Sequence, residues 1–298
     1  MKREYGMPYM GSKRKLSKHL ISYMLRKNPN AKYFYDLFGG GGAMSFEALH
    51  YKQLKEVHYN EYNAGVVALL KDVLENGVTD KYYKWIDRET FNKHKGDNSW
   101  LGGLRKVVWS FGNNQSCYLF GSEIEEDKRL LHEIVVNACE KSLKIFNEKH
   151  NMNIKLLKTD TTIKKRRLRV KKIIKIKLKN RDGELERLER LEQLERLERL
   201  LNKLTIHNKS YNEVKITTPL EETIIYLDPP YENTAKYEKD ISHKELLKWI
   251  KQQKCKVYVS SYEFDGLKKV YSKTHRSTLN ATANNEVEEK LFLWGGAK

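Results

Sequence analysis

The sharpest chemical signal in the sequence is the run Asp228-Pro229-Pro230-Tyr231, which follows TIIYL, an apolar segment that is predicted to be a buried strand. Two successive prolines fix the backbone, so the Asp228 carboxylate and the Pro229 carbonyl can converge on one point. Two rigid acceptors suit an exocyclic amine with two N–H groups, and Tyr231 offers a flat face for a base. The exocyclic nitrogen of adenine is a poor nucleophile, and such acceptors would aim its lone pair at an electrophile. A chance proline turn after a strand is the alternative.

A second signal is the glycine run in DLFGGGGAM, where the predicted strand YFYDLF (33–38) meets a helical pattern. Glycines at such a junction let the backbone approach a ligand closely, and the helix N-terminus offers free amide groups. The run is not a P-loop, because no Lys-Ser or Lys-Thr follows, and Met44 stands where the third glycine of the dinucleotide fingerprint would fall. About twenty residues later Glu61 ends the next predicted strand, where it could accept hydrogen bonds from ribose hydroxyls. A nucleotide-like ligand and a tight structural turn both stay open.

The charge balance points to a polyanionic partner. The 298 residues include 57 Lys and Arg against 39 Asp and Glu, a formal net charge of +18. Nucleic acid is the simplest partner for such a charge, and a solvated basic surface is the alternative. Ten of the cations, with no acid between them, lie in Lys164–Lys179. This basic block, including Lys164, Lys165, Arg166 and Arg167, is predicted to grip phosphates and not to read bases; a solvated or disordered run is the alternative.

Side chains suited to base edges occur in the middle of the chain. Arg105, Asn113, Asn114 and Gln115 are able to bond guanine or adenine edges and are therefore the candidates for sequence readout. The asparagines could equally serve only to shape turns.

Other chemistries have little support. The three cysteines, Cys117, Cys139 and Cys255, lie far apart without a CxxC spacing, which is typical of reduced intracellular thiols and not of a disulfide framework. The nine histidines form no ligand pattern with them, so we expect no metal. No apolar run approaches a membrane span, and the chain starts without a signal-peptide pattern. We therefore expect no membrane contact and a cytoplasmic protein.

The elements around the two motifs follow an α/β pattern. A helix is predicted over 15–27, then the strand 33–38, a helix after the glycine run, a strand over 57–63 and the helix AGVVALLKDVL. Strand, glycine turn, helix and strand open a doubly wound parallel sheet. The pattern resumes with strands in KLTIHNKSY, TIIYL and KVYVSSY, a helix over 242–253, and two last strands, VYSKTHRSTL and EEKLFLWG, which could form a hairpin at the sheet edge.

The middle of the chain is expected to form a separate lobe. The second half of the basic block, KIIKIKLK, alternates, which favours a strand with one cationic face, and NRDG could close a turn. In the segment LERLERLEQLERLERLLNKL, leucine recurs at every third position from Leu185 to Leu200, so in a helix the leucine stripe would drift around the axis. Glu-to-Arg pairs four residues apart slightly favour a helix over a short solenoid of six-residue repeats.

The order YMGSKRKL, DLFGGGG, NEYN, a variable lobe and DPPY resembles the Dam-type (alpha-group) DNA N6-adenine methyltransferases, and WSFGNNQSCYLFG resembles their phage and mobile-element members. The resemblance implies an α/β, Rossmann-like S-adenosylmethionine-dependent methyltransferase fold with an inserted, mainly helical target-recognition lobe. The catalytic domain is then expected over 1–76 and 203–298. The lobe is expected over 77–202, with a basic segment (164–181) and a leucine-repeat insert (184–204).

The resemblance also assigns roles to single residues. Tyr9 and Lys13, in YMGSK, match positions near the methionine part of S-adenosylmethionine, and Glu61 matches the acid on its ribose hydroxyls, usually an aspartate. The positions that match the methionine and adenosine cradle are Asp36, Phe38, Gly39, Gly40 and Gly41.

The catalytic motif around a flipped adenine is matched by Asp228, Pro229 and Tyr231, and Asp228 also borders the cofactor. Many relatives have an aspartate against the cofactor adenine where this chain has Ser210, which can donate a hydrogen bond but carries no charge. Weaker cofactor binding is the consequence that this departure implies.

The resulting expectation is direct transfer of the methyl group of S-adenosylmethionine to adenine N6 in double-stranded DNA. No cysteine follows a proline, which agrees, because C5-cytosine methylation needs a cysteine nucleophile. The base must leave the duplex stack to be methylated. The alternatives are an RNA adenine methyltransferase and a catalytically silent DNA-binding protein on the same fold. The host would be a bacterial or phage-infected cell, and whether a cognate restriction endonuclease is a partner stays open.

Overall fold

The computed structural model describes residues 5–9, 11–94, 96–111, 116–177, 183–195, 197, 203–230, 241–276 and 286–296. The chain forms two compact units. The first comprises Met1–Gly6, Gly11–Val67 and Arg199–Lys298, and the second comprises Met7–Met10 and Ala68–Glu198. Each unit is described below by itself.

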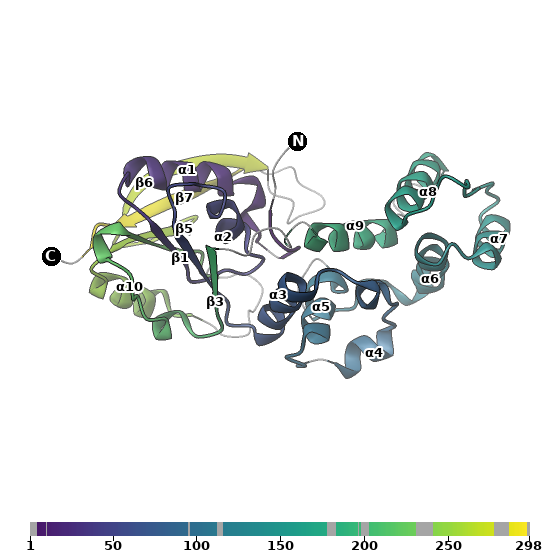
Figure 1. The fold of residues 1–298 in the computed structure, drawn as a ribbon, viewed down its shortest axis with the longest axis horizontal. Helices are drawn as coiled ribbons and strands as arrows, with labels where there is room; N and C mark the ends of the chain where they lie inside the picture. The colour runs from purple at the N-terminus through teal and green to yellow at the C-terminus, as the bar shows by residue number, and fades with distance from the viewer. Residues whose placement is uncertain are drawn as a thin grey trace. The chain divides into compact units, whose positions relative to one another are not determined.

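The first unit is built on a seven-stranded sheet with the order β3-β2-β1-β4-β5-β7-β6 (Figure 1). Its first five strands are parallel, and β7 and β6 are antiparallel to their neighbours. The predicted strands and the terminal hairpin are thus confirmed, with β6 at the edge of the sheet. The strands are β1 (Tyr33–Asp36), β2 (Glu56–Asn60), β3 (Leu204–His207), β4 (Thr223–Leu227), β5 (Lys256–Ser261), β6 (Lys268–Arg276) and β7 (Glu286–Trp294).

Apolar layers cover both faces of this sheet, as a buried parallel sheet requires. On one face α1 (Ser17–Lys27) and α2 (Ala43–Ala48) bury Leu20, Met24 and Met44 against Phe34 and Ile224 of the strands. The other face packs against α10 (His243–Gln252) (Figure 1). The central strands β1, β2, β4 and β5 are buried along most of their length, and this is why β4 reads as a continuous apolar run in the sequence.

The second unit is helical in its described part. Its α5 begins at a serine cap, where the Ser99 hydroxyl accepts from the Gly102 amide, and α4 begins at Asp87 in the same way. The helices are α4 (Arg88–Lys93), α5 (Trp100–Val108), α6 (Ser122–Val136), α7 (Glu140–Lys149), α8 (Ile163–Lys177) and α9 (Gly183–Glu195), after α3 (Ala64–Asn76), which runs from the first unit into the second.

The prediction of a strand in KIIKIKLK is wrong, because its described part belongs to α8. Alternation over a few residues is ambiguous, and upstream residues decide it here. Arg167, Val170 and Ile174 are buried at spacings of three and four, which is the period of a helix. Of the NRDG segment (180–183), where a turn is predicted, residues 180–182 lie outside the described residues, and Gly183 is the first residue of α9.

The leucine repeat forms a helix, as the sequence slightly favoured. Leu185, Leu188, Leu191 and Leu194 of α9 are all buried, although their spacing turns the stripe through about 180° over the four residues. The drift is accommodated because α9 contacts α5, α6, α8 and the 3-10 helix Asp80–Tyr83. The repeat is therefore core material of the second unit.

Candidate active site

The candidate active site lies where the strand order of the sheet changes direction. β1 lies between β2 and β4, so the connections leave it on two sides, and ligands of doubly wound sheets bind at such a point beyond the carboxyl ends of the strands. Asp36, the last residue of β1, is in register with Tyr226 of β4. The Asp228 turn and the glycine run therefore emerge side by side from adjacent parallel strands.

The glycine run makes a tight loop that a side chain would obstruct. Gly40 and Gly42 have positive φ angles of 49° and 76°, and Gly42 is the N-cap of α2. A Cβ at Gly39 would lie 2.2 Å from a ring carbon of Tyr59. The Tyr59 hydroxyl in turn donates to the Gly40 carbonyl at 2.7 Å. The Tyr59 ring and the Asn60 carbonyl therefore leave no space for a side chain at position 39.

Glu61, directly after β2, holds the same loop from the other side. Its two carboxylate oxygens accept from the amides of Gly40 and Asn63, both at 2.8 Å. Asn60 connects this region to the segment after β3, since its side chain donates to the carbonyls of Leu37 and Lys209. The segments after three strands are therefore joined by hydrogen bonds, and of the predicted cofactor residues Gly40 and Glu61 are bonded directly.

Asp36 is a buried carboxylate with spare bonding capacity. Its side chain is 1% exposed, and its Oδ2 accepts from the Ser45 hydroxyl at 2.8 Å. Its Oδ1 is buried without a hydrogen-bond partner among the described residues. Burial raises the pKa of Asp36 to about 7, and the charges of Asp228 and Glu61 add to the effect. An acceptor in this state suits a ligand that brings a positive charge.

Asp228 shares a buried ammonium group with a second acid. The Lys13 Nζ donates to Asp228 Oδ1 at 2.9 Å and lies 3.6 Å from Glu289 Oε2. The Lys13 and Glu289 side chains are 6% and 2% exposed, and that of Asp228 is 20% exposed. Glu289, on β7, also accepts from the Ser260 hydroxyl of β5 at 2.7 Å. Three strands and the N-terminal segment thus meet in one polar cluster.

The cluster carries more acid than base, which shapes the pKa of each member. Burial alone would lower the pKa of the Lys13 ammonium, but the carboxylates of Asp228 and Glu289 outweigh it and raise that pKa. Burial raises the pKa of Asp228, Lys13 opposes this effect, and Glu289 reinforces it. Lys13 thus stays charged, and Asp228 is an acceptor whose charge depends on its neighbours.

Aromatic rings border the glycine loop. Phe38, half-buried, stacks on Tyr211 with ring centroids 5.3 Å apart, and Tyr211 packs edge-on against Trp249. Ser210 precedes Tyr211 as the N-cap of a short 3-10 helix, and its amide donates to the Glu213 carboxylate at 2.9 Å. A flat apolar wall and a hydroxyl therefore adjoin the loop at the ends of β1 and β3.

The other predicted residues of the site are placed as follows. Gly41 and Pro229 are buried, and Tyr9 is partly buried and belongs to the second unit. Tyr231 lies outside the described residues, as do Asn113, Asn114 and Gln115.

The cations predicted to bind DNA differ in their surroundings. Arg105 is 1% exposed, donates to the Phe91 carbonyl at 2.7 Å and lies over the Phe91 ring. Arg166 and Arg167 of α8 have partners inside the second unit, whereas Lys164 and Lys165 are exposed. Phe111, the last described residue before position 116, is 63% exposed.

Glu289 and Ser45 are the members of the site that sequence reasoning missed. Ser45 lies in the helix directly after the glycines, so its closeness to Asp36 could have been inferred from the strand–turn–helix pattern. Glu289 had a weaker signal, namely an acid at a position where the alternation of the last strand faces the sheet interior.

Within the described residues, the structure holds no group of three or more His, Cys, Asp or Glu arranged to bind a metal ion. No helix of the described part is both long and apolar enough to cross a membrane.

Sheet order, antiparallel β7 and the site at the carboxyl ends of β1 and β4 define a Rossmann-like methyltransferase fold. The family model of the D12 class N6 adenine-specific DNA methyltransferases matches residues 9–289. The chain belongs to this family, and its function is the methylation of adenine N6 in DNA. The search of curated proteins found no match.

The residues at the loop fit the cofactor that this family implies. S-adenosylmethionine brings an ammonium and a sulfonium cation together with ribose hydroxyls. The Asp36 Oδ1, which has no hydrogen-bond partner among the described residues, and the Glu61 carboxylate are acceptors for such groups.

Proposed function

We propose that the chain is a site-specific methyltransferase that uses S-adenosylmethionine to methylate adenine N6 in double-stranded DNA, with Asp228 and Pro229 as the acceptors for the adenine amine. The observation that carries the proposal is the placement of Asp228 beside the glycine loop, on the neighbouring parallel strand. Reacting groups held at adjacent strand ends can be brought into line without a covalent intermediate.

The cofactor's part is to present an electrophilic methyl group on its sulfonium. Asp36 would hold its cationic methionine part, Glu61 its ribose hydroxyls, and Phe38 and Ser210 its adenine. Asp228 and the Pro229 carbonyl would accept hydrogen bonds from the two N–H groups of the target amine. This arrangement favours a lone pair on the amine nitrogen that is aimed at the methyl group. Tyr231 would stack on the flipped base.

The role of Lys13 differs here from the contact with the methionine part of the cofactor that the resemblance implies. The Lys13 ammonium donates to Asp228 Oδ1 and would therefore compete with the adenine amine for this carboxylate. We infer that Lys13 moves toward Glu289, 3.6 Å away, when the base enters. Because Glu289 is already buried next to the ammonium, the shift leaves no buried charge without a partner.

Of the predicted DNA-binding residues, we assign Arg105, Arg166 and Arg167 to the packing of the second unit, because all three have partners there. Lys164 and Lys165 remain candidates for phosphate contacts. A cognate restriction endonuclease also stays a prediction of the sequence.

The test uses purified protein, S-adenosylmethionine and unmethylated genomic DNA, followed by mass spectrometry of the nucleosides. We expect N6-methyladenine with the natural chain and none with Asp228→Ala. Sequencing the methylated DNA then gives the recognition site. Methyladenine produced equally by Asp228→Ala would overturn the catalytic assignment, and methylation of RNA alone would overturn the assigned substrate.

A further inference from the structure

The basic block divides into two faces when it folds into α8. Four of its cations are directed to partners within the second unit. Arg166 donates to the carbonyls of Val135 and Val136 at the end of α6, at 2.6 and 2.9 Å. Arg169 pairs with Asp160. The remaining two, Arg167 and Lys171, face α9.

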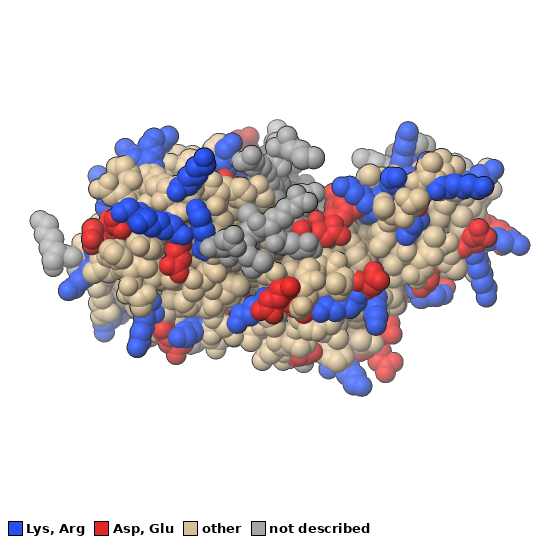
Figure 2. Space-filling view, in the orientation of Figure 1, with Lys and Arg blue, Asp and Glu red and all other residues tan. Residues whose placement is uncertain are grey.

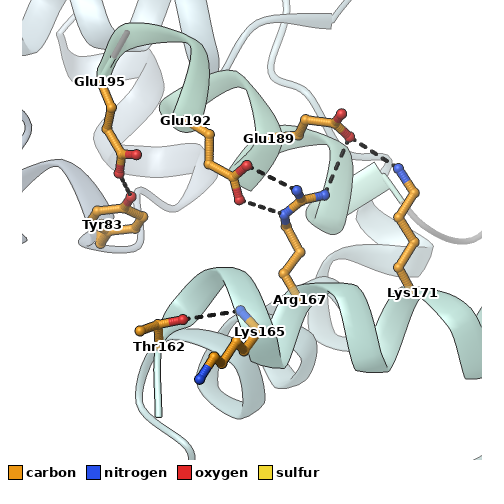
Figure 3. Close-up of polar contacts among 8 residues, drawn as sticks. All are labelled: Tyr83, Thr162, Lys165, Arg167, Lys171, Glu189, Glu192 and Glu195. Atoms are coloured by element: carbon orange, nitrogen blue, oxygen red, sulfur yellow. Dashed lines mark hydrogen bonds and ion pairs between the residues drawn. The ribbon is translucent and has the colours of Figure 1, made fainter. Parts of the chain in front are cut away.

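The leucine-repeat helix α9 supplies the acids for this second pair. The Arg167 guanidinium makes a bidentate pair with the Glu192 carboxylate, with hydrogen bonds of 2.9 and 3.0 Å, and donates a third hydrogen bond to Glu189 at 3.3 Å (Figure 3). The Lys171 ammonium donates to the same Glu189 oxygen at 3.1 Å. The Arg167 side chain is 5% exposed, so this pairing is largely removed from solvent. Its geometry is that of a structural contact between two helices.

The opposite face of α8 is exposed and cationic. Lys164, Lys165 and Lys172 are exposed, and around them Leu168 is 51% exposed. Figure 3 shows the Lys165 ammonium away from the glutamates of α9, and its charge acts on Asp160 at the start of the helix. Within the described residues, the ammonium groups of Lys164 and Lys172 make no hydrogen bond or ion pair.

The spacing of these residues places them on one ridge. Positions 164, 168 and 172 are four apart, so they follow one side of the helix over about 12 Å. α8 itself contains no acidic residue that could neutralise them. Lys and Arg side chains stand out from the surface over α8 in Figure 2. Like charges held on one ridge repel one another until an anion neutralises them.

We propose that this ridge, Lys164, Lys165 and Lys172 around Leu168, binds the phosphate backbone of duplex DNA, and that α9 confines the contact to this face by neutralising Arg167 and Lys171. The proposal rests on the proposed function, which makes DNA the polyanion that the enzyme meets. A row of ammonium groups without hydrogen-bond partners suits point contacts to phosphates and not the reading of bases.

This inference gives the leucine repeat a purpose. Its leucines hold α9 in the core of the second unit. Its glutamates at 189 and 192 pair with Arg167 and Lys171, so these two cations are not available to bind phosphates. A polyanion would otherwise have cations on several sides of α8 to bind. The repeat thereby sets the size of the electrostatic footprint on DNA.

The experiment compares two variants that each lose two positive charges from α8. Lys164→Gln/Lys172→Gln removes cations from the ridge, and Arg169→Gln/Lys171→Gln removes cations that have acidic partners. Fluorescence anisotropy with a labelled duplex, without cofactor, gives the dissociation constant between about 50 and 300 mM salt. The slope of log affinity against log salt measures how many phosphates are contacted.

For the ridge variant we expect the slope to fall by about 1.8, because each phosphate contact contributes roughly 0.9. For the paired variant we expect an unchanged slope and a lower melting temperature. Equal slopes in the two variants, or a slope lost only in the paired variant, would overturn the proposal. Melting curves of both variants confirm that a folded protein is measured.

The outcome is separable from that of the proposed function. If the natural chain methylates DNA but the ridge variant keeps its full slope, only the ridge proposal fails. If the natural chain binds duplex DNA through the ridge but methylates none, the proposed reaction fails and the ridge stands.

Discussion

Both units bury charged side chains, but they balance them differently. In the first unit Lys13 meets two acids, the partly buried Asp228 and the buried Glu289, and Asp36 lies buried with an oxygen that has no partner among the described residues. In the second unit two buried arginines, Arg167 and Arg187, pair with acids. Arg167 meets acids of α9, and a second pair follows the same rule.

That second pair is the clearest example of balance. Arg187 and Glu184 are both 0% exposed and bonded at 2.7 and 2.8 Å, with His132 at 3.1 Å and the Arg187 guanidinium 4.0 Å from the Trp109 ring centroid. The two charges of this pair neutralise each other without a ligand, although Arg187 Nη1 has no hydrogen-bond partner among the described residues. An excess of buried acid, in contrast, costs free energy until a cation arrives. The difference distinguishes a structural ion pair from a binding site when both are buried.

The largest effect should come from breaking the balanced pair. Arg187→Met leaves Glu184 buried without its partner and should lower the free energy of unfolding by ~3–5 kcal/mol. Urea unfolding measures it, and the double variant with Glu184→Gln should regain part of the loss. A loss below about 1 kcal/mol would show that the pair is not a structural requirement.

Asp228 should have the next largest effect, on rate and not on stability. Asp228→Ala should lower the methyl-transfer rate by about 10²–10³, the usual cost of losing a preorganised electrostatic contact. Single-turnover assays measure the rate. Glu222→Gln is the matched control, since Glu222 precedes β4 where Asp228 follows it, and pairs with Lys32. Equal rates in the two variants would contradict the role of Asp228.

The unbalanced site should respond to pH. Because burial raises the pKa of Asp36 to about 7, its carboxyl holds a proton below that pH and is a poor partner for a cation. We expect the affinity for S-adenosylmethionine to rise up to about tenfold per pH unit from pH 6 to 7 and then level off. Calorimetry at several pH values measures it, and Asp36→Asn should remove the dependence.

In the unliganded protein, the folding stability should depend on pH in the direction opposite to the cofactor affinity. A raised pKa means that the folded state holds the proton more tightly than the unfolded chain does. The Asp36 contribution to stability should therefore improve as the pH falls from about 7 toward 4. Asp36→Asn, which mimics the protonated state, should be more stable than the natural chain at pH 8. A less stable variant at that pH would argue that the Asp36 charge is already compensated.

Glu289 should show the smallest effect. Glu289→Gln removes one of the two acids that Lys13 contacts, so Lys13 should hold Asp228 more tightly, the adenine amine should compete less well, and the rate should fall about fivefold, or ~1 kcal/mol. The variant also removes a charge that raises the pKa of Asp228, so the acidic limb of the pH–rate profile should move to lower pH. Glu289→Asp should restore both. A lower rate without a shifted limb would indicate a structural role only.

Much of the first unit could be predicted because its signals are local. The glycines at 39–42 and the prolines at 229–230 restrict the backbone by themselves, and each follows an apolar run that is long enough for one strand. Glu61 comes directly after such a strand. Such residues restrict the backbone or end a strand locally, so the chemistry at each strand end could be predicted, whereas the adjacency of β1 and β4 is seen in the sheet order.

The strand in KIIKIKLK could not be excluded in this way, because alternation and a helical period agree over so few residues. The helix is decided by burial of Val170 and Ile174 within the second unit. The pairing of charges in the basic block could not be predicted from the sequence either. Its charges are evident in the sequence, but which of them are neutralised depends on the placement of α9 beside α8.

What the sequence by itself determined is the chemistry at each strand end, because backbone restriction and residue type act over a few neighbours. What only the tertiary structure decided is the pairing of charges. Lys13 lies 215 residues before Asp228, and Glu189 of α9 pairs with Lys171 of α8. The reason is physical, since an ionic contact depends on distance and burial in the folded chain, which local propensity does not encode.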